Sequence, residues 1–160
     1  MALSSSEIKT AYPLPVYNFR VEIAGVAVAF SEVSGLSISL ESTTYKESPT
    51  ASGKVGPTIM YMPSQRSAVN VTLKKGLVRT HSLATLYAWI SSTRINQVDK
   101  KDIYVRLMNE EGAAVISWKV ANAFPTKLDV PSFDANSNEV AVESMELMAD
   151  FVTVEEAKGA

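Results

Sequence analysis

Residues Ile103–Val120 read I-Y-V-R-L-M-N-E-E-G-A-A-V-I-S-W-K-V, and this stretch indicates the fold class most clearly. Larger apolar side chains recur at every second position along Ile103–Leu107 and again along Ala114–Val120, which is the period of a half-buried strand. Between them, Asn109–Gly112 has the composition of a hairpin turn, with glycine where a positive φ is needed. The stretch therefore predicts two antiparallel strands joined by a tight turn.

The same period of two runs through most of the remaining chain. The polar stretch Pro63–Arg66 predicts a turn, and Glu139–Val154 fits either period, although its β-branched residues favour strand. Roughly eight strands, several in hairpin order, indicate a mainly β protein with an antiparallel β-sandwich or barrel. The further strands are predicted at Val16–Ile23, Val26–Phe30, Leu36–Leu40, Thr58–Met62, Val69–Leu73 and Glu139–Val154.

One segment, Thr80–Arg94, has the period of an amphipathic helix. Apolar side chains recur there at i, i+3, i+4 and i+7, so they share one face, and a hydroxyl of Thr80 or Ser82 could cap the first turn. We expect this single flanking α-helix to divide two groups of strands and to close one side of the barrel. The residues of the predicted apolar face are Leu83, Leu86, Tyr87 and Ile90.

The chain is predicted to form one domain over residues 1–160. Residues 1–15 contain two prolines, which restrain the backbone and predict an extended N-terminal arm. Residues 46–57 hold two glycines, two prolines and few apolar side chains, so they predict a long exposed loop. A loop of that length is often functional, and a disordered surface excursion is the alternative. Residues 155–160 are expected to be a flexible tail.

Charge and cysteine content exclude several classes of partner and site. A formal net charge of −2 gives no general attraction for nucleic acid or acidic lipid, so we expect no specific nucleic-acid recognition. The chain has no cysteine, which excludes disulfides and thiolate chemistry.

The start, M-A-L-S-S-S-E-I-K, lacks the basic and apolar regions of a signal peptide. No apolar run approaches the ~20 residues that span a bilayer. We therefore expect synthesis in the cytoplasm, no membrane insertion by the chain itself, and release by a route other than a signal peptide.

Signals of enzymatic chemistry are weak. His81 is the only histidine and adjoins Ser82, but adjacent residues on a helix project in different directions, and no third group orients the pair. Glu143, Glu146 and Asp150 could offer carboxylates to a hard cation, yet no calcium-loop pattern accompanies them. We expect neither an enzyme nor a bound cofactor or metal.

Several stretches, taken in order, resemble the tail tube protein family of contractile phages and related contractile injection systems. The resemblance covers most of the chain, from about Tyr17 to Leu147. Two departures stand out: Lys46–Pro49 follows Tyr45 where the family commonly has a Glu-Gly-Gly type of turn, and Met148–Phe151 replaces a His-Gly-type ending. The stretches that carry the resemblance are Phe19–Ile23, Phe30–Leu36, Leu73–Gly76, Asn122–Lys127 and Asn138–Leu147, together with Trp89 and Trp118.

The resemblance implies a structural subunit of an inner tube. Such subunits form homo-hexameric rings that stack around a hollow lumen, through which cargo such as an effector or DNA passes. The implied partners are a contractile sheath protein, baseplate or spike proteins and terminator proteins. The implied location is a phage tail or phage tail-like particle, which can be released from the cell. The two departures leave open a specialised ring near the baseplate.

Two hypotheses follow for residues. Small polar side chains on alternating strands are expected to line the lumen: Ser37, Ser39, Glu41, Asn70, Thr72 and Lys74. The long loop is expected to reach a neighbouring subunit or ring through Lys46, Glu47, Pro49, Gly53, Lys54 and Gly56.

Two other classes of protein remain as alternatives. A ligand-binding β-barrel of the lipocalin kind would need a large apolar cavity lined by large side chains, which the serine-rich faces do not favour. A carbohydrate-active enzyme on a β-sandwich would need an acid/base pair, and none can be identified.

Overall fold

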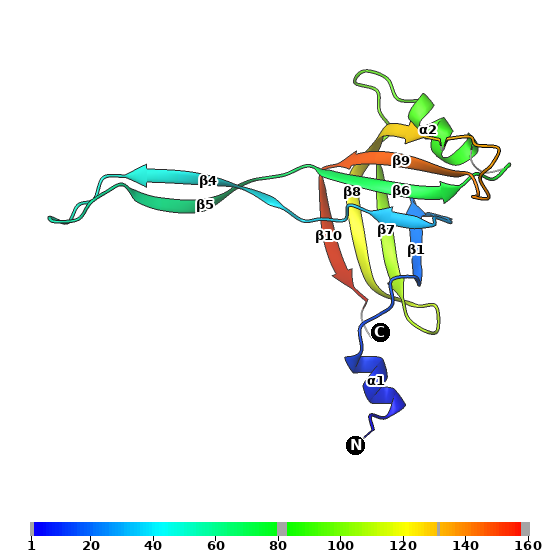
Figure 1. Ribbon diagram of the computed structural model, residues 1–160, viewed down its shortest axis with the longest axis horizontal. Helices are drawn as coiled ribbons and strands as arrows, with labels where there is room; N and C mark the ends of the chain where they lie inside the picture. Colours follow the sequence, from blue (N-terminus) through cyan, green and yellow to red (C-terminus); the bar gives the residue numbers. More distant parts are fainter. Residues whose placement is uncertain (1, 80–82, 131, 158–160) are drawn as a thin grey trace.

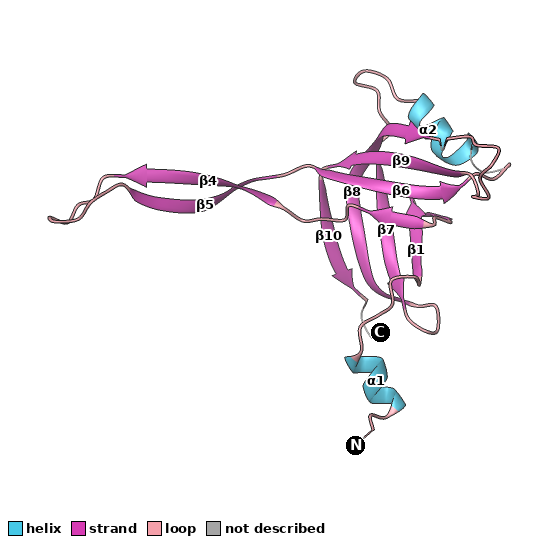
Figure 2. Cartoon of the chain, viewed as in Figure 1, coloured by secondary structure: helices cyan, strands magenta, loops and turns pink. Residues whose placement is uncertain are grey.

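The computed structural model describes residues 2–79, 83–130 and 132–157. Within them the chain forms ten strands and two short α-helices, the second preceded by one turn of π-helix (Figures 1 and 2). The helical segments are α1 (Ser5–Ala11), the π-helical turn Leu83–Tyr87 and α2 (Ala88–Ser91). The strands are β1 (Phe19–Ile23), β2 (Val26–Val28), β3 (Glu32–Ser34), β4 (Leu40–Glu47), β5 (Thr58–Arg66), β6 (Val69–Gly76), β7 (Lys101–Met108), β8 (Ala114–Asp129), β9 (Val142–Ala149) and β10 (Phe151–Glu156).

Two layers share the long strand β8. The first half of β8 pairs with β7 and β10, and its second half pairs with β9. This gives a first layer in the order β2-β1-β7-β8-β10 and a second layer in the order β8-β9-β6-β3, all antiparallel. Strands of the second layer cross the direction of the first-layer strands in Figure 2. Asn122, with φ of 53°, lies where β8 passes from one layer to the other. The mainly β, antiparallel architecture is thereby confirmed.

The core lies between the two layers, and β6 shows why the chain folds this way. Val69, Val71 and Leu73 are buried, whereas Asn70 and Thr72 between them face outward. The same alternation in β7, β8 and β9 supplies the facing side chains, so burial of apolar area holds the layers together. The fully buried side chains include Ile103, Val120, Met145 and Leu147.

The first helix departs from the sequence prediction, because α1 lies inside the stretch expected to be an extended arm. Ser4 accepts a hydrogen bond from the Glu7 backbone N–H, and the Glu7 carboxylate accepts one from the Ser4 backbone N–H. This capping box satisfies backbone groups that a short helix leaves unpaired. The prolines follow the helix, which ends at Ala11, and the Tyr12 backbone before Pro13 is extended.

The predicted strand Leu36–Leu40 is wrong. Pairing stops after β3 because Gly35, with φ of 85°, turns the chain, and the next strand starts only at Leu40. The predicted turn Pro63–Arg66 is also wrong, since these residues continue β5. As a result β4 and β5 form a long two-stranded hairpin, separate from the two layers and projecting from them (Figure 1). The predicted loop 46–57 comprises the end of β4 and the hairpin tip.

The second helical segment is shorter than predicted and ends at Ser91. Its buried side chains are Leu86 and Trp89, with Ile90 packed against the core, so part of the predicted apolar face is confirmed. Tyr87 is 53% exposed and does not belong to that face. The Trp89 indole N–H donates to the Asp99 carbonyl at 2.8 Å, which anchors the helix to the following connection. The predicted capping residues, Thr80 and Ser82, lie outside the described residues.

The end of the chain forms two strands, β9 and β10, where the sequence favoured strand over helix. Glu155 and Glu156 pair with β8, and the Ala157 backbone N–H donates to the Val115 carbonyl at 2.8 Å. The expected flexible tail therefore does not begin at residue 155, because strand pairing continues to the end of the described chain.

Candidate assembly surfaces

The β4–β5 hairpin exposes a set of apolar side chains that the body of the molecule does not cover. All residues of both strands are exposed. An isolated two-stranded hairpin is marginally stable in water, and exposed apolar patches mark contact surfaces. The hairpin thus has the composition of a surface that is buried in an assembly. Its exposed apolar side chains are Leu40, Tyr45, Ile59, Met60, Tyr61 and Met62.

The hairpin tip contains the residues predicted to reach a neighbour. Lys46 and Glu47 end β4, and Pro49, Gly53, Lys54 and Gly56 belong to the connection to β5. A side chain at Gly56 would collide with the Pro49 ring, so the connection closes tightly on itself. Gly53 has φ of 81°, which favours glycine in the turn. The structure therefore brings these six residues together at the far end of the molecule (Figure 1).

The outer face of the second layer is polar and carries half of the predicted lumen residues. Asn70, Thr72 and Lys74 all lie on this face of β6. Lys74 pairs with Glu32 of β3 at 3.4 Å. On the same face, Lys127 pairs with Asp129 at 3.1 Å, and this hydrogen bond, with the charges of Asp129 and Glu146, raises the pKa of the Lys127 ammonium. Charges of both signs are therefore paired side by side across the face.

The other predicted lumen residues lie away from this face. Ser37 and Ser39 belong to the connection between β3 and β4, where the Ser39 carbonyl accepts a hydrogen bond from the Ser67 backbone N–H at 3.3 Å. Glu41 lies on β4, at the base of the hairpin. All three are exposed, but the structure does not join them to β6 in a single sheet.

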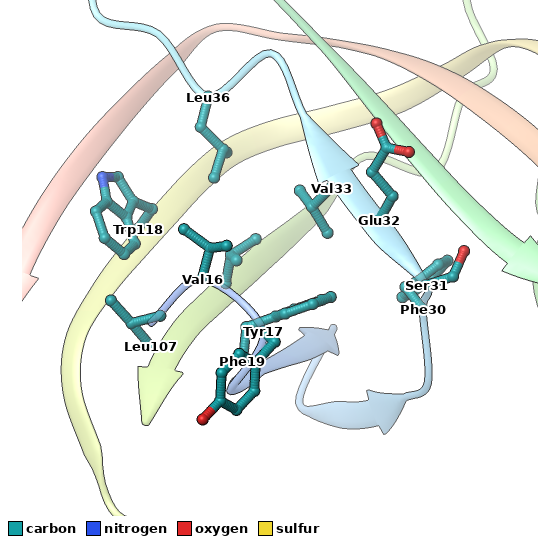
Figure 3. Close-up of a pocket in the computed structure, with 11 residues that line it drawn as sticks. Val16, Tyr17, Phe19, Phe30, Ser31, Glu32, Val33, Leu36, Leu107 and Trp118 are labelled. Carbon is teal, nitrogen blue, oxygen red and sulfur yellow. The ribbon is translucent and has the colours of Figure 1, made fainter. Parts of the chain in front are cut away.

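An open apolar concavity, which no sequence pattern predicted, lies between the first layer and the edge strand β3 (Figure 3). Phe19, Leu107 and Trp118 come from the first layer, and Val33 and Leu36 come from β3 and the segment after it. The space measures about 760 Å³. Val16 is 86% exposed and Tyr17 is 81% exposed at its mouth, so it is a surface depression and not an enclosed ligand cavity. In the sequence, the only related signal is the group of bulky apolar residues Val16, Tyr17 and Phe19.

The outer face of the first layer holds a network of charged side chains. Glu22 accepts hydrogen bonds from Arg20 at 2.6 Å and from Arg106 at 3.2 Å, and Arg106 also donates to the Ser117 hydroxyl at 3.1 Å. The hydrogen bond from Arg20, assisted by Arg106, holds the pKa of the Glu22 carboxyl below its usual value. Strands β1, β7 and β8 are linked by these contacts, which residue spacing alone could not reveal.

The carboxylates considered for a cation do not converge. Glu143 is buried, whereas Glu146 projects from the opposite face of β9 because three positions separate them on a strand. Asp150 accepts a hydrogen bond from the Asn122 side chain at 2.8 Å. His81 lies outside the described residues. In the part of the chain that the structure describes, no helix has both the length and the apolar character to cross a membrane.

Comparison with known proteins gives a family match over nearly the whole chain. The model of the T4-like virus tail tube protein gp19 family matches residues 15–153. The chain belongs to this tail tube protein family. None of the curated proteins compared with it matches.

Solved structures agree with this membership of the tail tube family. A chain of the extended PVC sheath–tube complex, an extracellular contractile injection system, is 40% identical to this tail tube protein, with a TM-score of 0.87. That comparison covers 98% of this chain and 100% of the other. A chain in the structure of the anti-feeding prophage tube-terminating cap is 42% identical, with a TM-score of 0.83 over 98% of this chain and 100% of the other. A chain of the anti-feeding prophage baseplate is 20% identical over 93% and 99% of the two chains, with a TM-score of 0.71, and shows the fold alone.

Proposed function

We propose that this tail tube protein forms hexameric rings that stack into the inner tube of an extracellular contractile injection particle. The observation that carries the proposal is the exposed β4–β5 hairpin, which stands out from the body and cannot bury its apolar side chains within one subunit. Association with further copies removes that apolar area from water. The likeness to a chain of a sheath–tube complex supports the same role over the whole length.

Contacts within a ring are assigned to the apolar concavity and the edge strands. The concavity exposes Val16 and Tyr17, which a second copy would cover. It adjoins β3, an edge strand of the second layer whose outer backbone groups are available for pairing with another chain. A permanent ring of this kind needs more than ~1,000 Å² buried at each contact. Pairing around a closed ring would cover the backbone groups of β3, which are otherwise exposed to aggregation.

The lumen is assigned to the outer face of the second layer, which carries Asn70, Thr72 and Lys74. Ser37, Ser39 and Glu41 at the base of the hairpin are assigned to its rim. A face of small polar groups and paired charges of both signs offers little for cargo to bind. Passage of an effector or of DNA requires a surface of that kind. The partners of the assembled tube are a contractile sheath protein and the baseplate, spike and terminator proteins at its ends.

The role is that of the main tube and not of a ring next to the baseplate. The chains with 40% and 42% identity come from a sheath–tube complex and a tube-terminating cap, whereas the baseplate chain has 20%. The role is structural, and no catalytic step is assigned to the chain.

Electron microscopy and sedimentation of the purified protein test the proposal. We expect ring-shaped or tubular particles in the micrographs and a sedimentation coefficient that corresponds to six or more copies. Deletion of residues 50–54 at the hairpin tip should shorten or abolish tubes, while urea denaturation and circular dichroism of the subunit stay unchanged because the tip does not contact the body. Monomers only, or tubes of normal length from the deletion variant, would contradict ring assembly or the role of the tip, respectively.

A further inference from the structure

Helix α1 stands clear of the body of its own subunit, beyond the turn that joins β7 to β8 (Figure 1). None of its residues is buried, and its Lys9 forms an ion pair with Glu111 of that turn at 3.5 Å. The capping box at Ser4 supports the first turn of the helix. A helix of seven residues is nevertheless marginal in water unless one of its faces packs on a partner. A surface outside its own subunit would supply that partner.

One face of α1 is apolar and open to solvent. Ala11 and Tyr12 follow Ile8 at three and four positions, so the three side chains lie close together at the end of the helix. Ile8 is 38% exposed and Tyr12 is 57% exposed. Thr10 lies on the opposite side, where its hydroxyl is hydrogen-bonded at 3.2 Å to carbonyl oxygens of the preceding turn. The helix thus has an apolar face and a polar face, and the single subunit buries neither.

The segment after α1 leads the helix away from the concavity of its own subunit. The Asn18 amide donates to the Asn109 carbonyl at 2.9 Å, so the end of the arm is fixed beside the turn between β7 and β8. The residue before Pro13 is extended. Val16 and Tyr17 line the mouth of the concavity, whereas no residue of α1 lines it. The concavity is therefore left open by the helix that lies nearest to it along the chain.

The apolar concavity has the size and the chemistry to receive the apolar face of a helix. Its space of about 760 Å³ lies within the range of roughly 300–1,000 Å³ that is usual for sites that bury a group. Phe19 and Trp118 supply aromatic walls, which pair favourably with a tyrosine ring. In Figure 3 the side chains of Val33 and Leu36 point toward the first layer across this space. Because the concavity is open, the Tyr12 ring can be buried there while its hydroxyl stays in water.

We propose that α1 of one copy docks in the apolar concavity of the adjacent copy in the same ring, which rests on the ring assembly proposed above. Ile8 and Tyr12 then cover the aromatic walls. The helix and the concavity are different surfaces, so their contact is heterologous, and a heterologous contact closes into a ring when its rotation returns to the first copy. Each subunit gives one helix to one neighbour and receives one helix from the other.

Reach and position favour a second copy of this chain as the source of the helix. The five residues 12–16 span at most ~18 Å when extended, and the helix adds about 10 Å. The apolar face of α1 is thereby carried past its own subunit and within reach of a subunit that touches it. Docking also continues the ring contact assigned to the concavity, since Val16 and Tyr17 of the receiving copy border the docked helix. One contact covers both the helix face and the concavity.

The chain contains no cysteine, so pairs of introduced cysteines test the docking directly. Ile8→Cys is combined with Leu36→Cys, and the assembled protein is treated with a short bismaleimide, which joins two thiols. We expect a ladder of linked chains that ends at six copies, because the contact closes around one ring. The matched control, Thr10→Cys with Leu36→Cys, places the first thiol on the polar face of α1 and should give at least roughly tenfold less product.

The size of the linked products shows where the helix lies. A link within a single chain would place α1 on its own subunit, and ladders longer than six copies would place it on another ring, so either result would overturn the docking. Equal product from the Thr10→Cys control, or no product from rings that assemble normally, would show that the apolar face does not enter the concavity. Absence of rings from the unmodified protein would instead overturn the proposed ring, and the docking with it.

A second measurement uses exposed residues of α1, whose substitution leaves the core of the subunit intact. Ile8→Glu places a charge on the apolar face, and Thr10→Glu places the same charge on the polar face. We expect Ile8→Glu to raise the protein concentration at which half of the rings dissociate by roughly tenfold or more, since docking removes the apolar face from water. Thr10→Glu should leave that concentration nearly unchanged. Sedimentation velocity measures both, and equal concentrations for the two variants would contradict the docking.

Discussion

Gly35 shows how one residue decides where the hairpin begins. Its φ of 85° ends the pairing of β3, and its α-carbon lies against the backbone of Asn70, where an added Cβ would overlap the Asn70 carbonyl oxygen. The alternation of Leu36, Ile38 and Leu40 suggested a strand because nothing in a period of two reports a backbone turn. A close approach of this kind depends on a residue 35 positions away, so it cannot be predicted from the residues next to Gly35.

Gly35→Ala should therefore destabilise the subunit. A side chain in the left-handed region costs about 1–2 kcal/mol, and the overlap with Asn70 adds to that cost. Urea denaturation should show a lower midpoint for the variant. Gly76→Ala serves as the control, because its new Cβ meets no atom within 4 Å. Equal midpoints for the two variants would show that Gly35 carries no special constraint.

Glu22 links two arginines on the outer face of the first layer, and the link should give a pH-dependent contribution to stability. The pKa of its carboxyl is lowered in the folded state, chiefly by the Arg20 hydrogen bond, so the contribution is present above the usual pKa of 4.5 and is lost as the pH falls through the folded value. Glu22→Gln should lower the free energy of unfolding near neutral pH by on the order of 1 kcal/mol. Denaturation of both proteins at about pH 7 and about pH 3 measures this. A difference that persists undiminished in acid would contradict the ionic origin.

At the scale of elements, the sequence predicted those strands whose burial alternates and missed those set by distant contacts. Val69–Leu73, Ile103–Leu107 and Ala114–Val120 were correct because each has one face on the core. The length of the hairpin was underestimated, because both faces of β4 and β5 are exposed. Their sequences therefore lack the contrast between an apolar buried face and a polar exposed face. Of the predicted site residues, those of the hairpin tip lie close together in the structure. Ser37, Ser39 and Glu41 do not lie in the same sheet as β6, because the chain turns at Gly35.

The hairpin is expected to be the least protected strand pair of the isolated subunit. Its backbone hydrogen bonds are exposed to water and lack a covering layer, so local opening costs little free energy. Hydrogen exchange should be fast in β4 and β5 and slow in β6 and β9. In assembled tubes, hairpin exchange should slow by roughly tenfold or more. The same exchange in both states would mean that assembly does not cover the hairpin.

Helix α1 depends on its own cap and not on the body. None of its residues is buried, and within the described residues an ion pair of Lys9 with Glu111 at 3.5 Å links it to the body. Ser4→Ala should reduce helicity of residues 5–11, since loss of an N-cap costs about 1 kcal/mol, while the midpoint of global unfolding should not move. Backbone NMR chemical shifts and thermal melting report the two quantities. A lowered melting temperature would show that α1 packs on the subunit in solution.

At the scale of the whole molecule, one strand organises the assembly surfaces. Because β8 belongs to both layers, the first layer presents its charged face and an open apolar concavity, and the second layer presents a face of small polar groups. The hairpin projects from the body along the strand direction of the second layer (Figure 1). In the proposed tube, lateral closure into a ring and contact of the hairpin with a neighbour thus use different parts of the chain.

A cryo-electron microscopy map of the assembled protein, at a resolution that shows side chains, would test the proposed tube and its lumen face together. We expect a hollow tube of stacked six-subunit rings, with Asn70, Thr72 and Lys74 facing the lumen and each hairpin lying on the next ring. Isolated particles without a lumen, or a tube in which these three side chains are buried between subunits, would contradict it.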